Sequence, residues 1–530
     1  MIVAAVALLV HFGCQDDTAS ASRDEPRYDH LLVIVGDDHG YATLGAYGND
    51  YIQTPGLDRL AAEGVRFEKA YATSPICSAS RQSALCGKYP HATGVNMLFT
   101  PFPDEGNLTL AEHLRAQGFA TAIIGKTHFN NWLWGPLYKE GPPDHGFSLR
   151  VGKPAYREWL KNRQPAPLPD SIPTRSNQTG SGVAWSKNAD MLPVAQRKAD
   201  AEAAFFVDQA LLFMQQHRNG KSLTWLAFHE PHAPFTYPVE YRHRYHADSI
   251  PFPAGSPEDE RWVPEIFRGL TEAERRGIIT SYYRSVTHMD HQVNRLLDSL
   301  EAKELLENTL VVYFGDQGYL LNDHRRFEKH SFWEESIRAP LIFRGQGLPQ
   351  GKVVEQPVSF VDIAPTLSAL SGTAQASDFQ GEGLQHLLMG NTPPDTAYVF
   401  SEYLLDNKAM VANRRWKYIF TAGTRDQTLS YATGYGPSGL YHRLYDLQND
   451  PRETTNLAYD PAQARRVKHL QQVMLRYFQQ THPDAHDCPS TLNTLGQLVW
   501  FCEPRDLGGD YQERPARVFE GEPYQPPTPE

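Results

Sequence analysis

The sequence predicts an α/β protein built on a parallel β-sheet, and three observations support that class. Short apolar runs alternate with amphipathic segments from about residue 29 to 372, as in a chain of strands and helices. Of the 530 residues, 41% are hydrophobic and 21% charged, which excludes a disordered or coiled-coil chain. The net charge of −12 argues against nucleic acid as a partner, because phosphate contacts need clustered Lys and Arg.

Strands and helices can be placed from local patterns. Thr54 caps a helix that has Pro55 in its first turn, and Thr109 with Glu112 forms a capping box. Helical spacing of apolar residues predicts a core-facing stripe of Val286, Met289, Val293, Leu296 and Leu300. Apolar runs predict buried strands at residues 31–35, 120–124, 223–228 and 310–314.

The chain divides into three predicted parts. Residues 1–22 predict a signal peptide, because their apolar run is too short to span a bilayer and a polar stretch follows it. Residues 23–375 predict the α/β domain, and no later apolar stretch approaches the ~20 residues of a membrane span. Residues 376–530 predict a smaller subdomain, with β-like runs at 398–400, 416–420 and 444–447, a helix over 462–479 and a Pro-rich tail from 514.

The N-terminus and the cysteines bear on the compartment. A signal peptide implies export to the periplasm or the cell exterior. Gly13-Cys14 resembles the end of a bacterial lipoprotein cleavage box, which leaves open a lipid anchor through Cys14. Cys488 and Cys502 could close one loop or stay as two thiols, because sequence separation does not fix their geometry.

Polar residues follow each of the four predicted strands. Ligands of open parallel sheets bind at the carboxyl ends of the strands, so these residues converge on one crevice if the strands are neighbours. Any single cluster is weak evidence, because Asp and Gly after a strand usually form a turn. The four clusters are Gly36-Asp37-Asp38-His39, Gly125-Lys126-Thr127-His128, His229-Glu230-Pro231-His232 and Gly315-Asp316-Gln317-Gly318.

Two features of these clusters point to chemistry. Asp37, Asp38 and Asp316 would repel one another, and a divalent cation would resolve this, with the Gln317 amide as a fourth oxygen. All-oxygen ligation favours Ca²⁺ or Mg²⁺ over Zn²⁺, although capping and turn roles of these Asp residues stay open. Cys77 follows a proline-led turn at a predicted helix N-terminus, where it is either a reactive thiolate or a small buried hydrophobe.

The stretch from Cys77 to Lys88 resembles the sulfatase motif C-x-P/A-S-R-x-x-x-L-T-G-R. The resemblance extends, in the expected order, to the strand-end clusters, to residues 329–340 and to the C-terminal runs at 415–418 and 444–453. Two residues depart from the motif, since Cys86 replaces Thr and Lys88 replaces Arg where the maturation enzyme reads the chain. The resemblance implies an alkaline phosphatase-like fold, with a large mixed, mostly parallel sheet between helices and a smaller C-terminal α+β subdomain.

The resemblance also implies a cofactor and a modified residue. A formylglycine-generating or equivalent sulfatase-maturing enzyme would oxidise Cys77 to Cα-formylglycine. One hydroxyl of the hydrated aldehyde would attack sulfur, and loss of the proton of the second would expel sulfate. Bound Ca²⁺, in preference to Mg²⁺, would be held by Asp37, Asp38, Asp316, Gln317 and the modified Cys77.

Further roles carry over from the family. Arg81 would steady the diol and His128 would act as its base. Lys126, His232 and Lys329 would bind sulfate oxygens, and His232 or Lys329 would protonate the leaving group. The roles of His39, His229 and His330 stay open.

The substrate implied by exported relatives is a sulfated carbohydrate, such as a glycosaminoglycan or another polysaccharide, with O- or N-linked sulfate. Arginines near family substrate segments could meet its uronates or further sulfates, or be ordinary surface charges. Two alternatives remain: a phosphonate monoester or phosphodiester hydrolase on the same fold, and a non-catalytic binder of sulfated glycans with Cys77 unmodified. The candidate arginines are Arg325, Arg326, Arg414 and Arg415.

Overall fold

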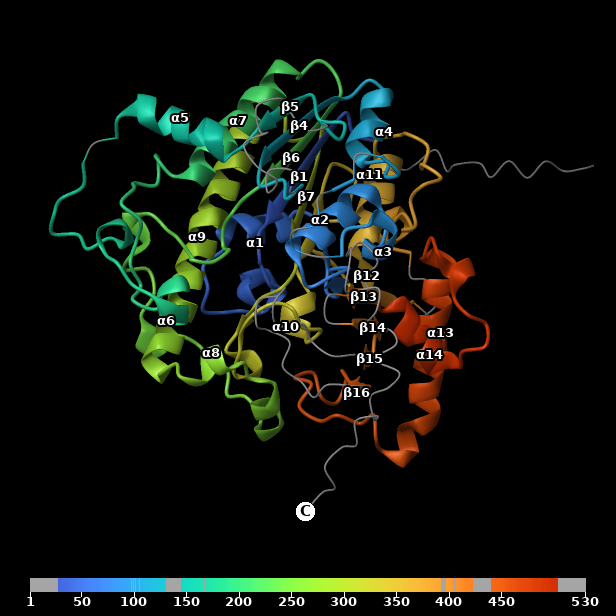
Figure 1. The fold of residues 1–530 in the computed structure, drawn as a ribbon. Coiled ribbons are helices and arrows are strands. Elements are labelled where there is room, and N and C mark those ends of the chain that lie inside the picture. The colour runs from blue at the N-terminus through green and yellow to red at the C-terminus, as the bar shows by residue number, and fades with distance from the viewer. Residues whose placement is uncertain are drawn as a thin grey trace, which may run out of the picture.

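A computed structural model describes residues 27–96, 98, 100, 102–103, 105–129, 144–165, 167–391, 397–404, 407–422 and 440–503. The predicted signal peptide, Cys14 and the Pro-rich tail lie outside these residues. At the centre is an eight-stranded sheet in the order β11-β2-β10-β7-β1-β6-β4-β5 (Figure 1), in which β10 runs antiparallel to its neighbours. Its strands are β1 (His30–Gly36), β2 (Val65–Phe67), β4 (Ala120–Gly125), β5 (Leu149–Val151), β6 (Ser222–Ala227), β7 (Thr309–Gly315), β10 (Leu341–Arg344) and β11 (Lys352–Val354).

The four predicted strands are direct neighbours in the middle of this sheet. They are β7, β1, β6 and β4, and all of them run parallel. Gly36 at the end of β1 is in register with Gly315 at the end of β7. The polar clusters that follow these strands therefore emerge at one edge of the sheet, as the sequence predicts.

Helices cover both faces of the sheet because its strands are apolar on both sides. Along β1, Leu31, Val33 and Val35 belong to one core cluster and Leu32 and Ile34 to the other. The first face packs against α2 (Cys77–Cys86), α4 (Leu110–Ala116), α11 (Ile363–Leu370) and α12 (Gln385–Leu388). The second packs against α1 (Pro55–Ala62), α5 (Lys153–Arg163), α7 (Glu202–Gln216) and α9 (Glu272–Ala302), as the two sides of Figure 1 show.

The C-terminal part forms a second, antiparallel sheet with the order β13-β14-β15-β16. One face of it lies on α13 (Ala464–Thr481) and α14 (Thr494–Phe501). Residues of the other face, including Met410 and Ile419, join the core cluster that contains α2 and α11. The strands are β13 (Val399–Tyr403), β14 (Lys408–Ala412), β15 (Trp416–Thr421) and β16 (Tyr441–Asp446), of which β14 was not predicted.

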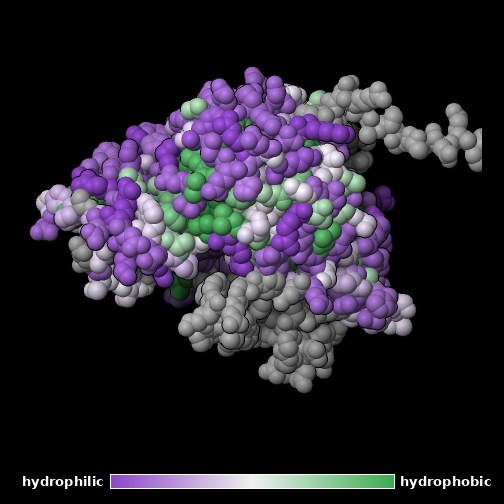
Figure 2. Space-filling view, turned by 90° about the horizontal axis from the view of Figure 1, so that it is seen from above, coloured by the Kyte–Doolittle hydropathy of each residue, from purple (hydrophilic) through white to green (hydrophobic). Residues whose placement is uncertain are grey.

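Short elements complete the described chain. Cys488 and Cys502, which the sequence left open as a pair, are not joined by a disulfide in the described part of the chain. Most of the face in Figure 2 is hydrophilic, and none of the described helices is long and apolar enough to cross a membrane. The remaining elements are β3 (Ala70–Tyr71), α3 (Pro90–Thr93), α6 (Gly182–Ser186), α8 (Glu265–Arg268), β8 (Leu320–Leu321), β9 (Phe327–Glu328), α10 (Glu334–Ile337) and β12 (Val358–Ser359).

Candidate active site

The ends of β1 and β7 bring three carboxylates together. Asp37 and Asp38 follow β1, Asp316 follows β7, and all three are buried. The backbone N–H of Asp38 donates to Oδ1 of Asp316 over 2.8 Å, which locks the two strand ends to each other. Gln317 is buried beside them, and its amide nitrogen contacts Oδ1 of Asp38.

Helix α2 places Cys77 against this cluster. All ten of its residues are buried, because the helix lies between the main sheet and the C-terminal sheet. Its first turn is tied to the end of β7: Oγ of Ser80 donates to the carbonyl oxygen of Asp316 over 2.5 Å, and Nε of Arg81 donates to Oδ2 of Asp316 over 2.7 Å. Cys77, as the first residue of α2, is thereby held at the carboxylates.

The donor set fits a hard metal ion. Single ligand atoms of Asp37, Cys77 and Asp316 lie within 4.8 Å of one another, and so do those of Asp37, Asp38 and His232. Within the described residues, Oδ1 of Asp37, which lies 3.4 Å from Nη2 of Arg81, and Oε1 of Gln317 are buried without a hydrogen bond. Buried polar atoms normally have partners, so these two oxygens suit metal ligation.

Neighbouring charges set the ionisation of the cluster. Burial alone would raise the pKa of Asp37, but the positive charges around it, led by that of Lys126 and including Arg81 and Lys329, hold that pKa well below its ordinary value. Burial raises the pKa of Asp316 to about 6, although Arg81 opposes the shift. Because Asp37 is ionised, a divalent cation beside it would be attracted strongly.

Two ammonium groups flank the sulfur of Cys77. Nζ of Lys329 lies 3.5 Å and Nζ of Lys126 lies 3.8 Å from Sγ. Lys126 also donates to Oδ2 of Asp37 over 2.5 Å, and Lys329 contacts Oδ1 of Asp38. The pair could bind the oxygens of an anion that reacts at Cys77.

Two predicted histidines complete the group. Burial holds the pKa of His128 well below its ordinary value, and Lys126 adds to the shift, so the ring is neutral at neutral pH. Nδ1 of His128 is buried without a partner among the described residues. Nε2 of His232 lies 3.6 Å from Oδ2 of Asp38, while its Nδ1 lies 2.7 Å from the carbonyl oxygen of Ala233.

A cavity of about 220 Å³ opens at Cys77. Six of the predicted site residues line it, namely Asp38, Cys77, Lys126, His128, His232 and Lys329. Lys187, Tyr319 and Glu328, which no motif in the sequence predicts, also line this cavity. His330, left open above, lines the cavity too, whereas His229 pairs with Glu202 and His39 with the Tyr313 hydroxyl.

The four candidate arginines are not among the residues that line this cavity. Arg325 pairs with Glu260, and Arg414 pairs with Glu355. Arg415 binds both carboxylate oxygens of Asp446 through its guanidinium. The guanidinium of Arg326 lies over the ring of Trp333, 5.5 Å from its centroid.

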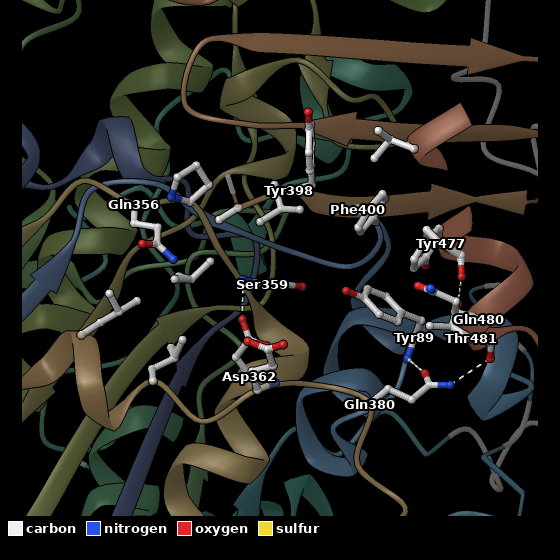
Figure 3. Close-up of a pocket in the computed structure, with 18 of the residues that line it drawn as sticks. Tyr89, Gln356, Ser359, Asp362, Gln380, Tyr398, Phe400, Tyr477, Gln480 and Thr481 are labelled. Atoms are coloured by element: carbon white, nitrogen blue, oxygen red, sulfur yellow. Dashed lines mark hydrogen bonds between the residues drawn. The ribbon is translucent and has the colours of Figure 1, made fainter. Parts of the chain in front are cut away.

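A larger cavity of about 660 Å³ lies between the main domain and the C-terminal sheet (Figure 3). Its lining includes Tyr89, Asp362, Tyr398 and the stacked rings of Phe400 and Tyr477, whose centroids are 4.1 Å apart. None of the predicted catalytic or metal residues lines it. Six of the residues predicted from the sequence line the smaller cavity instead.

The fold is alkaline phosphatase-like. A solved phosphonate monoester hydrolase from Silicibacter pomeroyi superposes with a TM-score of 0.71 at 23% identity, covering 88% of this chain and 98% of that one. The sequence profile described as "Sulfatase" matches residues 29–373, and one described as "N-sulphoglucosamine sulphohydrolase, C-terminal" matches residues 322–480. The chain belongs to the sulfatase family and is a sulfuric ester hydrolase.

Curated relatives agree with this assignment. An ulvan-active sulfatase of Formosa agariphila is 28% identical over 468 aligned residues, and the match covers 86% of this chain and 83% of the relative. A choline-sulfatase of Rhizobium meliloti is 28% identical over 458 residues, covering 82% and 83%. Each of these matches covers 83% of the relative.

Proposed function

We propose that this sulfatase releases sulfate from a sulfated carbohydrate, with a formylglycine made from Cys77 and a bound Ca²⁺. The observation that carries the proposal is the position of Sγ of Cys77, beside the buried carboxylates and within 3.8 Å of two lysine ammonium groups. Burial raises the pKa of the Cys77 thiol, so an unmodified cysteine would be a poor nucleophile here. Conversion to an aldehyde hydrate would supply a hydroxyl nucleophile at the same position.

Asp37, Asp38, Asp316 and Gln317 would hold the ion, and their oxygens suit Ca²⁺. Bound there, the cation would polarise sulfate oxygens and lower the pKa of a neighbouring hydroxyl.

The protein's own groups handle charge and protons. Lys126 and Lys329 bind the sulfate oxygens, and Arg81 steadies the hydroxyl groups at position 77. His128, neutral at neutral pH, accepts a proton at one of its ring nitrogens. His232 at Nε2, or Lys329 at Nζ, delivers a proton to the leaving oxygen.

The carbohydrate class is supported by the ulvan-active relative and by the N-sulphoglucosamine sulphohydrolase profile. Choline sulfate is the comparison substrate, because one relative is a choline-sulfatase. We expect kcat/KM to be higher on at least one sulfated mono- or oligosaccharide than on choline sulfate. Faster release from choline sulfate than from every sugar tested would overturn the carbohydrate proposal.

Aryl esters test the reaction class independently of the sugar. We expect faster hydrolysis of an aryl sulfate than of the matching aryl phosphonate monoester, and Cys77→Ala should reduce sulfate release by more than about a thousandfold. The protein should be produced together with a formylglycine-generating enzyme. A faster rate on the phosphonate would favour the alternative hydrolase.

We also propose that the chain is exported, as residues 1–22 predict. The N-terminal peptide mass of protein from its native host tests this. An intact Met1 terminus would contradict export through a cleaved signal, and a lipid-modified Cys14 would identify a lipoprotein.

A further inference from the structure

The wall of the Cys77 cavity carries a carboxylate that sulfate-ester hydrolysis does not require. Glu328, at the end of β9, lines the cavity together with Cys77 and His232, and it is 8% exposed. Among the described residues, its Oε2 is buried and accepts no hydrogen bond. Buried carboxylate oxygens are costly to leave without a donor, so a donor from a bound molecule would be stabilising at this point.

The other oxygen of Glu328 is fixed by Lys187. Nζ of Lys187 lies 3.4 Å from Oε1 of Glu328 and donates to the hydroxyl of Tyr319 over 2.9 Å. The same ammonium group lies 5.7 Å from the ring centroid of Phe267. Lys187 therefore has its own partners, and it orients Glu328 with Oε2 left as the acceptor.

The backbone at Glu328 has a strained conformation. Its φ is +104°, in a region that residues with a Cβ atom rarely adopt. The β8–β9 pair, in which Leu320 is opposite Glu328, holds this conformation. Strained backbone is retained where the surroundings fix it, often at functional sites. Glu328 directly precedes Lys329, so the strained residue joins the sulfate-binding lysine to the carboxylate in the cavity wall.

We propose that Glu328, oriented by Lys187, selects the leaving group of the substrate. Its Oε2 accepts a hydrogen bond from a free hydroxyl on the atom next to the sulfate-bearing one, and its charge disfavours an anionic group at that position. When applied to sugars, this inference rests on the proposed function. The preferred sugar unit then carries one sulfate next to a free hydroxyl, and not next to a second sulfate or a carboxylate.

Three aryl sulfates test the inference without a sugar. Phenyl sulfate, 2-hydroxyphenyl sulfate and 2-carboxyphenyl sulfate place hydrogen, a hydroxyl or a carboxylate next to the ester. The readout is kcat/KM for sulfate release by the full-length, matured protein, expressed as the ratio of each substituted ester to phenyl sulfate. Ratios between variant and wild type cancel the different leaving-group reactivities.

In Glu328→Ala, we expect the 2-hydroxyphenyl preference to fall by about tenfold, because an acceptor for that hydroxyl is lost. In both Glu328→Gln and Glu328→Ala, the rejection of 2-carboxyphenyl sulfate should weaken by about tenfold, since like charge is removed. Glu272→Gln, which changes an exposed carboxylate paired with Arg276, is the matched control and should leave both ratios unchanged.

Unchanged ratios in Glu328→Ala would overturn the inference. An equal loss of kcat/KM on all three esters would also overturn it, because it would show that Glu328 has a purely structural role. The sugar arm compares monosulfated monosaccharides with their disulfated counterparts in the same variants. If the aryl ratios shift but no sugar is cleaved, the role of Glu328 stands and the carbohydrate proposal fails. If sugars are cleaved but the aryl ratios do not change, the carbohydrate proposal stands and the proposed role of Glu328 fails.

Discussion

The ammonium group of Lys417 donates a hydrogen bond to the backbone carbonyl oxygen of Phe332 over 2.8 Å. Lys417 lies on β15 of the C-terminal sheet, whereas Phe332 follows Lys329 by three residues. Nζ of Lys417 also lies 2.7 Å from Oε1 of Glu334 and 2.8 Å from Oε1 of Glu453, and its side chain is fully buried. The C-terminal sheet thus supports the segment that carries a proposed sulfate ligand.

Lys417→Met should be strongly destabilising. Removal of the buried cation leaves Glu334 and Glu453 without their shared partner, which costs about 3–5 kcal/mol for a broken buried ion pair. Urea denaturation followed by circular dichroism measures the change. Arg414→Gln, two residues before this strand, breaks an exposed pair with Glu355 and should change stability little. Equal effects of the two variants would contradict the buried-cluster account.

Asp37→Asn should remove most of the bound metal. Asp37 belongs to both groups of potential metal ligands, and the variant loses its buried carboxylate. Sulfate release should fall by about a thousandfold, because the metal that would act as a Lewis acid is lost. Elemental analysis of the purified protein gives the metal content directly. Asp208→Asn, at an exposed carboxylate paired with Arg295, is the control. Full calcium content in Asp37→Asn would exclude this site.

Asp290 should make stability depend on pH. It accepts hydrogen bonds from the N–H groups of Gly56 and Leu57 at the start of α1, yet burial raises its pKa from 3.8 to about 7. The folded state therefore binds this proton more tightly than the unfolded state, and the contribution of Asp290 to stability falls as pH rises from about 4 to about 7.

Comparison of wild type with Asp290→Asn isolates this effect, because Asn cannot ionise. The stability of the wild type relative to the variant should decrease between pH 4 and 7, as measured by urea denaturation at fixed ionic strength. A difference that stays constant or grows over this range would show that Asp290 is not the group responsible.

The central strands and their polar ends were predictable because both signals are local. A strand buried on both faces is a continuous apolar run, and the residues after it lie at the ligand-binding edge of a parallel sheet. Asp37 and Asp316 could therefore be expected to meet, as Gly36 and Gly315 do in register. In contrast, β14 was missed because Lys408–Ala412 is a short run with little β-branched character.

Contacts between side chains that lie far apart in the sequence could not be predicted from local patterns. Lys187 reaches the cavity from a loop-rich region about 140 residues before Glu328, and no motif connects the two. Arg415, a candidate for substrate binding, has Asp446 beside it through the antiparallel pairing of β15 with β16, and the sequence did not predict this partner. The charge of Glu328 was visible in the sequence, whereas its buried, donor-free oxygen depends on the folded loop.

The most direct test of the account is the mass of the proteolytic peptide containing Cys77, from protein made in its native host. We predict a peptide about 18 Da lighter than the encoded sequence, because oxidation to formylglycine replaces the thiol by an aldehyde oxygen. Sulfate release should rise in proportion to the fraction of lighter peptide. A peptide that contains the thiol alone, in protein that still hydrolyses sulfate esters, would contradict the proposed role of Cys77.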